Sequence, residues 1–275
     1  MTSTVAGPST AVAVDPAAAP AARPGLTALD LLAGTSLLVV ALLGWASLGL
    51  AHVGAHSVPA VLGITVVVLA VVALLAVRVG VRPRLRADLP AVAVALGCAA
   101  VAFLLTYPGF SYGVSDKDPG GYVSHAISIS RTGDYSFIDP VLATNGQDPT
   151  FPVQVTTPGA RFSGVWVRDA AEGLIVPQFY HLWPALLATA HAAGGQFGLL
   201  AAVPLMGVLS VLVLCALLRR VGSAMMGERA GPAAGLVAAG AGGLLLATNM
   251  LQVWQTRFPT TEVLAQALYL SLIHI

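Results

Sequence analysis

Charged side chains are scarce in this chain. Of its 275 residues, only 9% are Asp, Glu, Lys or Arg, whereas 57% are hydrophobic. Soluble domains carry about 25% charged residues, so this composition excludes an ordinary soluble fold and indicates a protein that has the lipid bilayer as its solvent. The net charge of +1 leaves no basic surface for nucleic acid, which excludes a nucleic-acid-binding protein.

The sequence has only two cysteines, and its first residues do not have the pattern of a secretion signal. Cys98 and Cys215 each lie in a long apolar run, where a cysteine behaves as a small hydrophobic residue and says nothing about redox compartment. Residues 1–25 are rich in Ala, Pro, Ser and Thr, and Arg23 is their only basic residue. This composition differs from the basic start and short apolar core of a signal peptide. We therefore predict a disordered cytoplasmic tail over residues 1–25.

Long apolar runs are abundant. A helix needs about 20 mostly apolar residues to cross the hydrocarbon core of a bilayer. Five runs have that length: Leu26–Leu50, Val58–Val79, Leu89–Tyr107, Phe197–Leu218 and Gly231–Leu251. A sixth run begins at Pro259 and reaches Ile275 after 17 residues, which is short of the length needed to span the bilayer. The prediction is an all-α polytopic membrane protein with about six transmembrane helices, the last one truncated, and with further helices beyond Ile275.

Basic residues predict the orientation of these helices. Arginines gather between the second and third runs and between the fourth and fifth runs, at positions Arg78, Arg82, Arg84, Arg86, Arg219, Arg220 and Arg229. Because short cytoplasmic loops are enriched in Lys and Arg, both loops and the N-terminus are expected in the cytoplasm. Three transmembrane helices then occupy residues 26–107, and residues 108–177 form an extracytoplasmic loop. The Ala, Val, Gly and Arg bias is typical of a high-GC bacterium, which suggests a bacterial cell membrane.

The outer loop begins with the signature of a short helix. Asp118 suits the N-cap, Pro119 the first turn and Gly133 the C-terminal stop. An apolar stripe is formed by Tyr122, Val123, Ala126, Ile127 and Ile129, while Ser124, His125, Ser128 and Arg131 are expected to face elsewhere. This pattern predicts an amphipathic helix that lies flat on the membrane surface.

Two β-prone runs follow, "ARFSGVWVRD" and "GLIVPQFYHL". Separated by a short polar stretch, they predict a β-hairpin. The second strand leads into Val176–His191, which is short for a span and is predicted as an interfacial or re-entrant helix. The alternative, a full span, would place Arg219 and Arg220 outside, against the charge rule. Residues 178–275 are predicted to hold the interfacial helix and further transmembrane helices. His181 and its neighbours would then lie on the same side as Asp116 and Asp118.

Asp116 and Asp118 are two residues apart, so in extended chain their carboxylates project to one face. Such oxygen ligands suit a hard divalent cation such as Mg²⁺ or Mn²⁺, or both acids contact a substrate. The alternative for Asp118 is a purely structural helix cap. Lys117 lies between the acids, where it either offsets their charge or attracts a phosphate.

Three stretches carry a family resemblance: "SDKDPGGYVSHAISISRTGDY", "VPQFYHLWPALLA" and "NMLQVWQTRFPTTEVLAQAL". In their order between apolar runs they resemble the GT-C superfamily of membrane glycosyltransferases, such as protein O-mannosyltransferases and lipid A aminoarabinose transferases. The resemblance implies an enzyme that moves a sugar from a polyprenyl-phosphate donor to a glycan or protein acceptor at the outer face of the membrane. It implies Asp118, four residues before Tyr122, as the base of an inverting reaction. Many relatives follow this acid with Glu, whereas here Pro119 follows and the second acid is Asp116.

Further candidates lie near the later apolar runs. Arg257 is the only cation of the second outer loop and suits the leaving phosphate, or else it reaches from the interface to water. Glu262 either contacts substrate or complements the dipole of the last helix. His181 either binds acceptor or phosphate or is an interfacial histidine. Trp166, Trp183 and Trp254 suit an aromatic belt or stacking on sugar or lipid.

Two other functions fit the same apolar runs. A transporter or lipid flippase would also have many spans with Gly and Pro breaks. Transporters usually keep ionisable residues at mid-membrane, and these runs have none, which favours the enzyme. The second of these other functions is a non-catalytic membrane subunit whose loop binds a partner.

Overall fold

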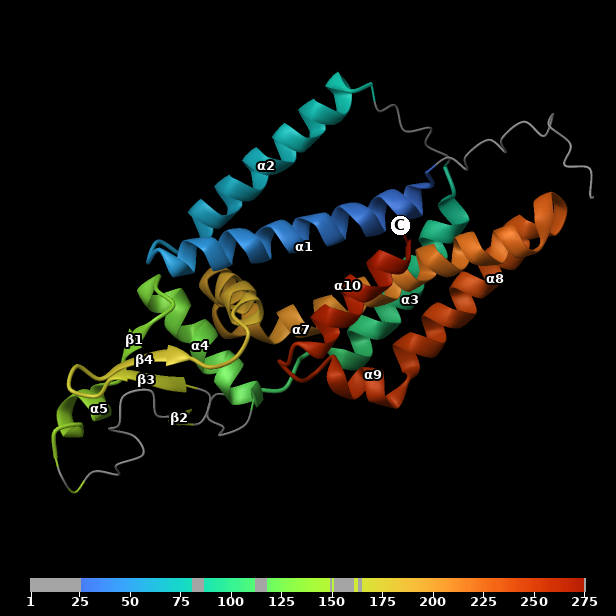
Figure 1. Ribbon diagram of the computed structural model, residues 1–275. Helices are drawn as coiled ribbons and strands as arrows, with labels where there is room; N and C mark the ends of the chain where they lie inside the picture. The colour runs from blue at the N-terminus through green and yellow to red at the C-terminus, as the bar shows by residue number, and fades with distance from the viewer. Residues whose placement is uncertain are drawn as a thin grey trace, which may run out of the picture.

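The structure is a computed structural model that describes residues 26–80, 87–111, 118–148, 150, 161–162 and 165–274 (Figure 1). The described chain is mainly helical, with one small sheet at one end. Five helices are long and apolar enough to cross a membrane. The coarse prediction of a mainly helical fold with several apolar helices of membrane-spanning length is therefore confirmed.

The five long helices match the five predicted runs. They are α1 (Ala28–His52), α2 (Val58–Arg78), α3 (Leu89–Thr106), α7 (Leu182–Met225) and α8 (Gly227–Thr248). The start of α1 is set by a capping box, in which the Thr27 hydroxyl accepts from the Asp30 amide and the Asp30 carboxylate accepts from the Thr27 amide. Pro59 and Pro90 stand in the first turns of α2 and α3, where the missing N–H costs nothing.

Helix α7 is bent at Gly195, whose φ of 57° is strained for any other residue. In Figure 1 the part before the bend is seen nearly end-on, and the longer part runs through the bundle. Gly198 makes this corner possible, because a Cβ there would collide with the Ala190 carbonyl. A separate helix before the fourth span was predicted over Val176–His191. It begins only at Leu182, because residues up to Pro177 form a strand.

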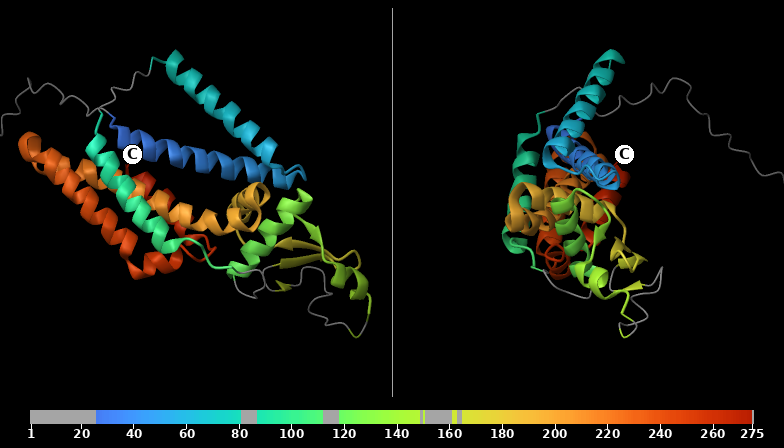
Figure 2. Two further views of the ribbon diagram at one scale, coloured as in Figure 1. Left: turned by 180° about the vertical axis from the view of Figure 1, so that it is seen from behind. Right: turned by 90° about the vertical axis from the view of Figure 1, so that its left-hand side faces the viewer.

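Helix α7 is the centre of the bundle. It contacts α1, α3, α8 and α10 (Glu262–His274) along its length, and α4 (Asp118–Thr132) near its start. By contrast, α2 leans away from the other helices (Figure 2), and only Val61 and Thr65 of its side chains are buried. Its apolar surface suits a helix that faces lipid, because apolar side chains have no hydrogen bonds with water to lose in hydrocarbon.

The sheet contains four short antiparallel strands in the order β1-β4-β3-β2. They are β1 (Phe137–Ile138), β2 (Arg161–Phe162), β3 (Val165–Asp169) and β4 (Leu174–Pro177). The predicted hairpin is β3–β4, with a bulge between Val167 and Asp169. The strands are shorter than the β-prone runs, and β1, which pairs with β4, was not predicted because two residues carry no alternation. Helix α5 (Pro140–Asn145), capped by Asp139, packs its Leu142 against this sheet.

Helix α4 has the predicted extent and stops at Gly133, which has a φ of 76°. One detail of its amphipathic pattern is wrong. His125 was expected to face away from the apolar stripe, yet it is only 2% exposed. The reason is that α4 is covered by α7 and also approaches the sheet, where the His125 ring lies 6.1 Å from that of Phe137. Two of its faces are therefore buried by protein.

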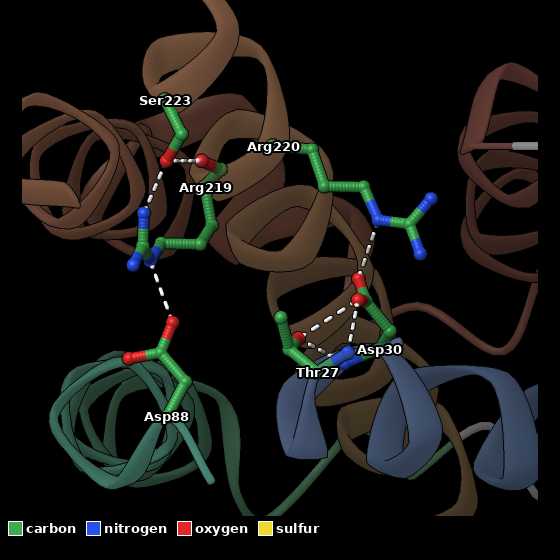
Figure 3. Close-up of polar contacts among 6 residues, drawn as sticks. All are labelled: Thr27, Asp30, Asp88, Arg219, Arg220 and Ser223. Carbon is green, nitrogen blue, oxygen red and sulfur yellow. Dashed lines mark hydrogen bonds and ion pairs between the residues drawn. The ribbon is translucent and has the colours of Figure 1, made fainter. Parts of the chain in front are cut away.

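The bundle has two ends that differ in their polar contacts. At the first, which we call the arginine end, α7 terminates beside the starts of α1 and α3 (Figure 3). Arg219 and Arg220 there pair with Asp88 and Asp30, each through an N–O distance of 2.8 Å. We call the second end the loop end. It contains α4 and the sheet, the last residues of α1, α3 and α8, and the first residues of α7 and α10.

Candidate functional site

Side chains from two distant segments meet at the loop end around the hydroxyl of Tyr122. Tyr122 is 5% exposed and packs its ring 5.2 Å from that of Phe179. Its hydroxyl shares a hydrogen bond with the Thr261 side chain, and the charges of Asp118 and Glu262 act on it. Two acids that are far apart in sequence therefore act electrostatically on one buried phenol. We call Asp118, Tyr122, Thr261 and Glu262 the acid–phenol cluster.

The pKa of the Tyr122 phenol is raised. Burial is the main cause, and the negative charges of Asp118 and Glu262 add to it, while the hydrogen bond with Thr261 works in the opposite direction. The phenol thus stays protonated at neutral pH and remains a hydrogen-bond donor. Both acids are exposed, so they are accessible to a ligand that approaches from the outside of the loop end.

The position of Glu262 depends on how α10 is anchored. The Trp183 indole N–H, 1% exposed, donates to the carbonyl of Pro259 over 3.1 Å. Three apolar side chains of α10, those of Val263, Leu264 and Ala267, are buried in the same core as α7. These contacts hold the first turn of α10 against α7.

Arg257 lies on the loop between α9 (Met250–Gln255) and α10. Its guanidinium carbon is 4.4 Å from the centroid of the Phe110 ring, and its carbonyl accepts from the Phe110 amide over 2.7 Å. The rings of Trp254 and Phe258 lie 5.5 and 5.3 Å from that of Phe110. Arg257 is therefore fixed on an aromatic surface formed partly by the segment that leads toward α4.

The buried Nε of Arg257 has no hydrogen-bond partner within the described residues. An unpaired buried donor is costly unless a ligand or water satisfies it. Arg257 thus keeps an unused donor next to the aromatic surface around Phe110.

Comparison with known proteins identifies no relative. No protein-family model matches this chain, and no curated protein and no solved structure is similar to it. The resemblance to GT-C glycosyltransferases therefore stays a hypothesis, and the chemistry of the site has to be argued from its geometry.

His181 belongs to a second cluster, toward the other end of α4. Its Nδ1 lies 3.5 Å from Nε2 of His52, and its ring centroid is 4.0 Å from that of Tyr135. Burial lowers the pKa of His181, and the nearby His52 contributes. The structure thus brings Asp118, Tyr122 and Glu262 together and places His181 in different surroundings.

Sequence reasoning missed the histidines that surround this second cluster. Burial lowers the pKa of His125 to about 4, and its Nδ1 has no partner in the described part of the chain. The Nε2 of His56, between α1 and α2, lies 3.0 Å from the Thr189 hydroxyl. A signal was present in the sequence, since His52 and His56 stand at the junction of two apolar runs, but their partners lie more than a hundred residues away.

Asp116 and Lys117 lie outside the described residues, so the predicted convergence of Asp116 with Asp118 stays a prediction. Across the described ranges, no group of three or more His, Cys, Asp or Glu is placed to hold a metal ion. Asp118 and Glu262 alone give two carboxylates, whereas Mg²⁺ or Mn²⁺ needs about six oxygen ligands, several of which can be water or phosphate. A divalent cation at this site therefore depends on Asp116 or on substrate oxygens.

Proposed function

We propose that this protein is a membrane glycosyltransferase that moves a sugar from a polyprenyl-phosphate donor to a hydroxyl acceptor at the loop end. The observation that supports the proposal is the acid–phenol cluster. The charges of Asp118, the residue assigned as base by the family resemblance, and of Glu262 both act on the buried Tyr122 hydroxyl, and Arg257 lies on the loop that leads into Glu262. The extracytoplasmic orientation of this end and the bacterial membrane are part of the same proposal.

The reaction requires a base and a cation. Asp118 takes the proton of the acceptor hydroxyl while that oxygen forms a bond to the anomeric carbon. The bond from this carbon to the phosphate oxygen breaks on the opposite face, which inverts the configuration. The lipid phosphate leaves with the electron pair, and the Arg257 guanidinium stabilises its negative charge.

Tyr122 and Glu262 serve as positioning residues in this scheme. The Tyr122 phenol, protonated at neutral pH, donates a hydrogen bond, and the Glu262 carboxylate accepts one. Together they orient hydroxyl groups of the substrate next to Asp118. An exposed carboxylate is a weak base, so the rate must come mainly from proximity and orientation.

A lipid flippase is the second candidate, and one observation favours it. A cavity of about 340 Å³ lies between α1 and α2 and is lined by apolar side chains such as Leu42, Trp45, Ile64 and Val68. A groove of this chemistry suits an acyl or polyprenyl chain. The same groove also serves an enzyme that holds a lipid donor, so it does not by itself decide between the two functions.

Reconstitution in liposomes with radiolabelled polyprenyl-phosphate sugars separates the candidates. Transfer of label from the lipid to a glycan or peptide acceptor is the expected result. Movement of labelled lipid between leaflets without transfer would overturn the enzyme in favour of the flippase. Neither transfer nor movement would favour a non-catalytic membrane subunit. Addition of EDTA to the active sample tests the divalent cation, since unchanged transfer would assign the acids a role without metal.

A further inference from the structure

A second cavity shares Glu262 with the acid–phenol cluster, and its mainly apolar walls carry several amide side chains. It has a volume of about 390 Å³, within the range of roughly 300–1,000 Å³ that is usual for small-ligand sites. Five of its lining residues carry amides or a carboxylate: Asn249, Gln252, Gln255, Glu262 and Gln266. They come from α9, from its N-cap and from the first turns of α10. Among the described residues, no Lys, Arg or His lines this cavity.

Gln252 is the side chain that points to a ligand. It is 9% exposed, lines the cavity, and its Nε2 has no hydrogen-bond partner in the described parts of the chain. The backbone N–H of Gln252 donates to the Asn249 side chain, so the side-chain amide of Gln252 is not needed to cap the helix. A buried amide with a free donor costs about 1–3 kcal/mol unless something binds to it. Gln252 therefore brings an unpaired donor to the wall of the cavity.

The lining also indicates the chemistry of that ligand. Each amide offers both donors and an acceptor, which matches hydroxyl groups that donate and accept. The remaining walls, Leu246, Leu251 and Val263, are apolar and suit the C–H face of a ring. Because none of the described lining residues is a cation, a phosphate is poorly matched there, whereas Arg257 outside the cavity suits one.

We infer that this cavity, which we call the amide cavity, binds a neutral sugar ring. The inference rests on the proposed function, because Glu262 belongs to both the amide cavity and the acid–phenol cluster. A sugar held by Gln252 and Gln266 would present its hydroxyls toward Glu262 and the Asp118 side of the site. The amide cavity thus holds the acceptor sugar, and Arg257 holds the phosphate of the donor.

Photolabelling tests the inference without requiring transfer. The full chain in lipid nanodiscs is exposed to a diazirine-bearing octyl glucoside, and the labelled residues are mapped by mass spectrometry, with free methyl glucoside and methyl mannoside as competitors. We expect label on α9 and the first turns of α10, and its loss when competitor is added. Gln252→Leu and, on the opposite wall, Gln266→Leu should each reduce this label at least fivefold. Gln147→Leu, at an exposed position of the outer loop, is the matched control and should leave the label unchanged.

Label that persists in both Gln252→Leu and Gln266→Leu, or that resists competition, would overturn the inference. Label confined to the groove between α1 and α2 would do the same, because the octyl chain alone would then determine binding. Asp118→Asn distinguishes this test from that of the proposed function. This variant should lose sugar transfer and keep the label that free sugar competes away. If the wild-type protein itself showed competable label but no transfer, the sugar site would be supported and the proposed enzymatic function would be wrong.

Discussion

The two ends of the helix bundle bury polar groups in different ways. At the arginine end, Arg219 and Arg220 are paired with Asp88 and Asp30, and Asp30 also accepts two hydrogen bonds from Thr27 (Figure 3). At the loop end lie all the buried side-chain nitrogen and oxygen atoms of the described residues that have no partner: His56 Nδ1, His125 Nδ1, Gln252 Nε2, Arg257 Nε and Thr260 Oγ1. One end is closed by ion pairs, whereas the other retains unused hydrogen-bonding groups.

The difference has a physical meaning. Ion pairs in a partly buried position contribute to stability when both partners are present, because each offsets the desolvation of the other. Unpaired buried donors only cost free energy, and native structures retain few of them. Their concentration beside the acid–phenol cluster and the amide cavity is therefore what a binding site requires. The comparison leads us to expect that substitutions at the loop end affect activity and those at the arginine end affect stability.

The sharpest test of this comparison is Asp118→Asn at the loop end. Loss of the base should lower sugar transfer about 10²- to 10⁴-fold, the usual contribution of a general base. Because Asp118 is exposed, the thermal unfolding midpoint should remain that of the wild type. Asp148→Asn, an exposed acid elsewhere in the loop, is the control. Transfer at the wild-type rate would remove Asp118 from the mechanism.

The reverse behaviour is expected at the arginine end. Arg220→Ala removes the guanidinium paired with Asp30, which is 6% exposed, and should destabilise the fold by about 3 kcal/mol, the lower part of the range for broken buried pairs. The lower part applies because the Arg220 side chain is 38% exposed. Thermal unfolding in one detergent measures the effect. Arg229→Ala, at an exposed position, should change little, and the double variant Asp30→Asn, Arg220→Gln should be milder than Arg220→Ala. Equal stability of Arg220→Ala and wild type would show that this end is not held by its ion pairs.

A smaller effect is expected from pH at the loop end. The pKa of His125 is about 4 in the folded protein and 6.5 ordinarily, so the unfolded state binds the proton first as the pH falls. Stability is therefore lost between the two values, by about 2 kcal/mol between about pH 7.5 and about pH 5. His56 and His181, whose pKa values are also lowered by burial, add to the same slope.

His125→Phe removes one titrating group from the same site. The unfolding midpoint of this variant should depend less steeply on pH than that of the wild type, whatever its stability at neutral pH. An unchanged slope would mean that His125 reaches water and a proton in the folded state.

The apolar runs predicted the long helices because a helix that crosses hydrocarbon must be long, apolar and internally hydrogen-bonded. The signals at the ends of α4, Pro119 and Gly133, were equally local, and the hairpin β3–β4 followed from two β-prone runs. The short strand β1 and the burial of His125 could not be predicted in this way. Both depend on elements distant in sequence, namely β4 and α7.

By itself the sequence determined the membrane class, the positions of the spanning helices and the choice of Asp118, Tyr122, Arg257 and Glu262 as candidates, because hydrophobic length and capping chemistry are local properties. Only the tertiary structure decided that the charges of Glu262 and Asp118 act on Tyr122, that His181 lies with His52 instead, and that Gln252 lines a cavity while its buried amide nitrogen has no partner among the described residues. Those relations arise where α10 packs on α7, and packing between distant helices depends on the shapes of whole surfaces, which no short stretch of residues specifies.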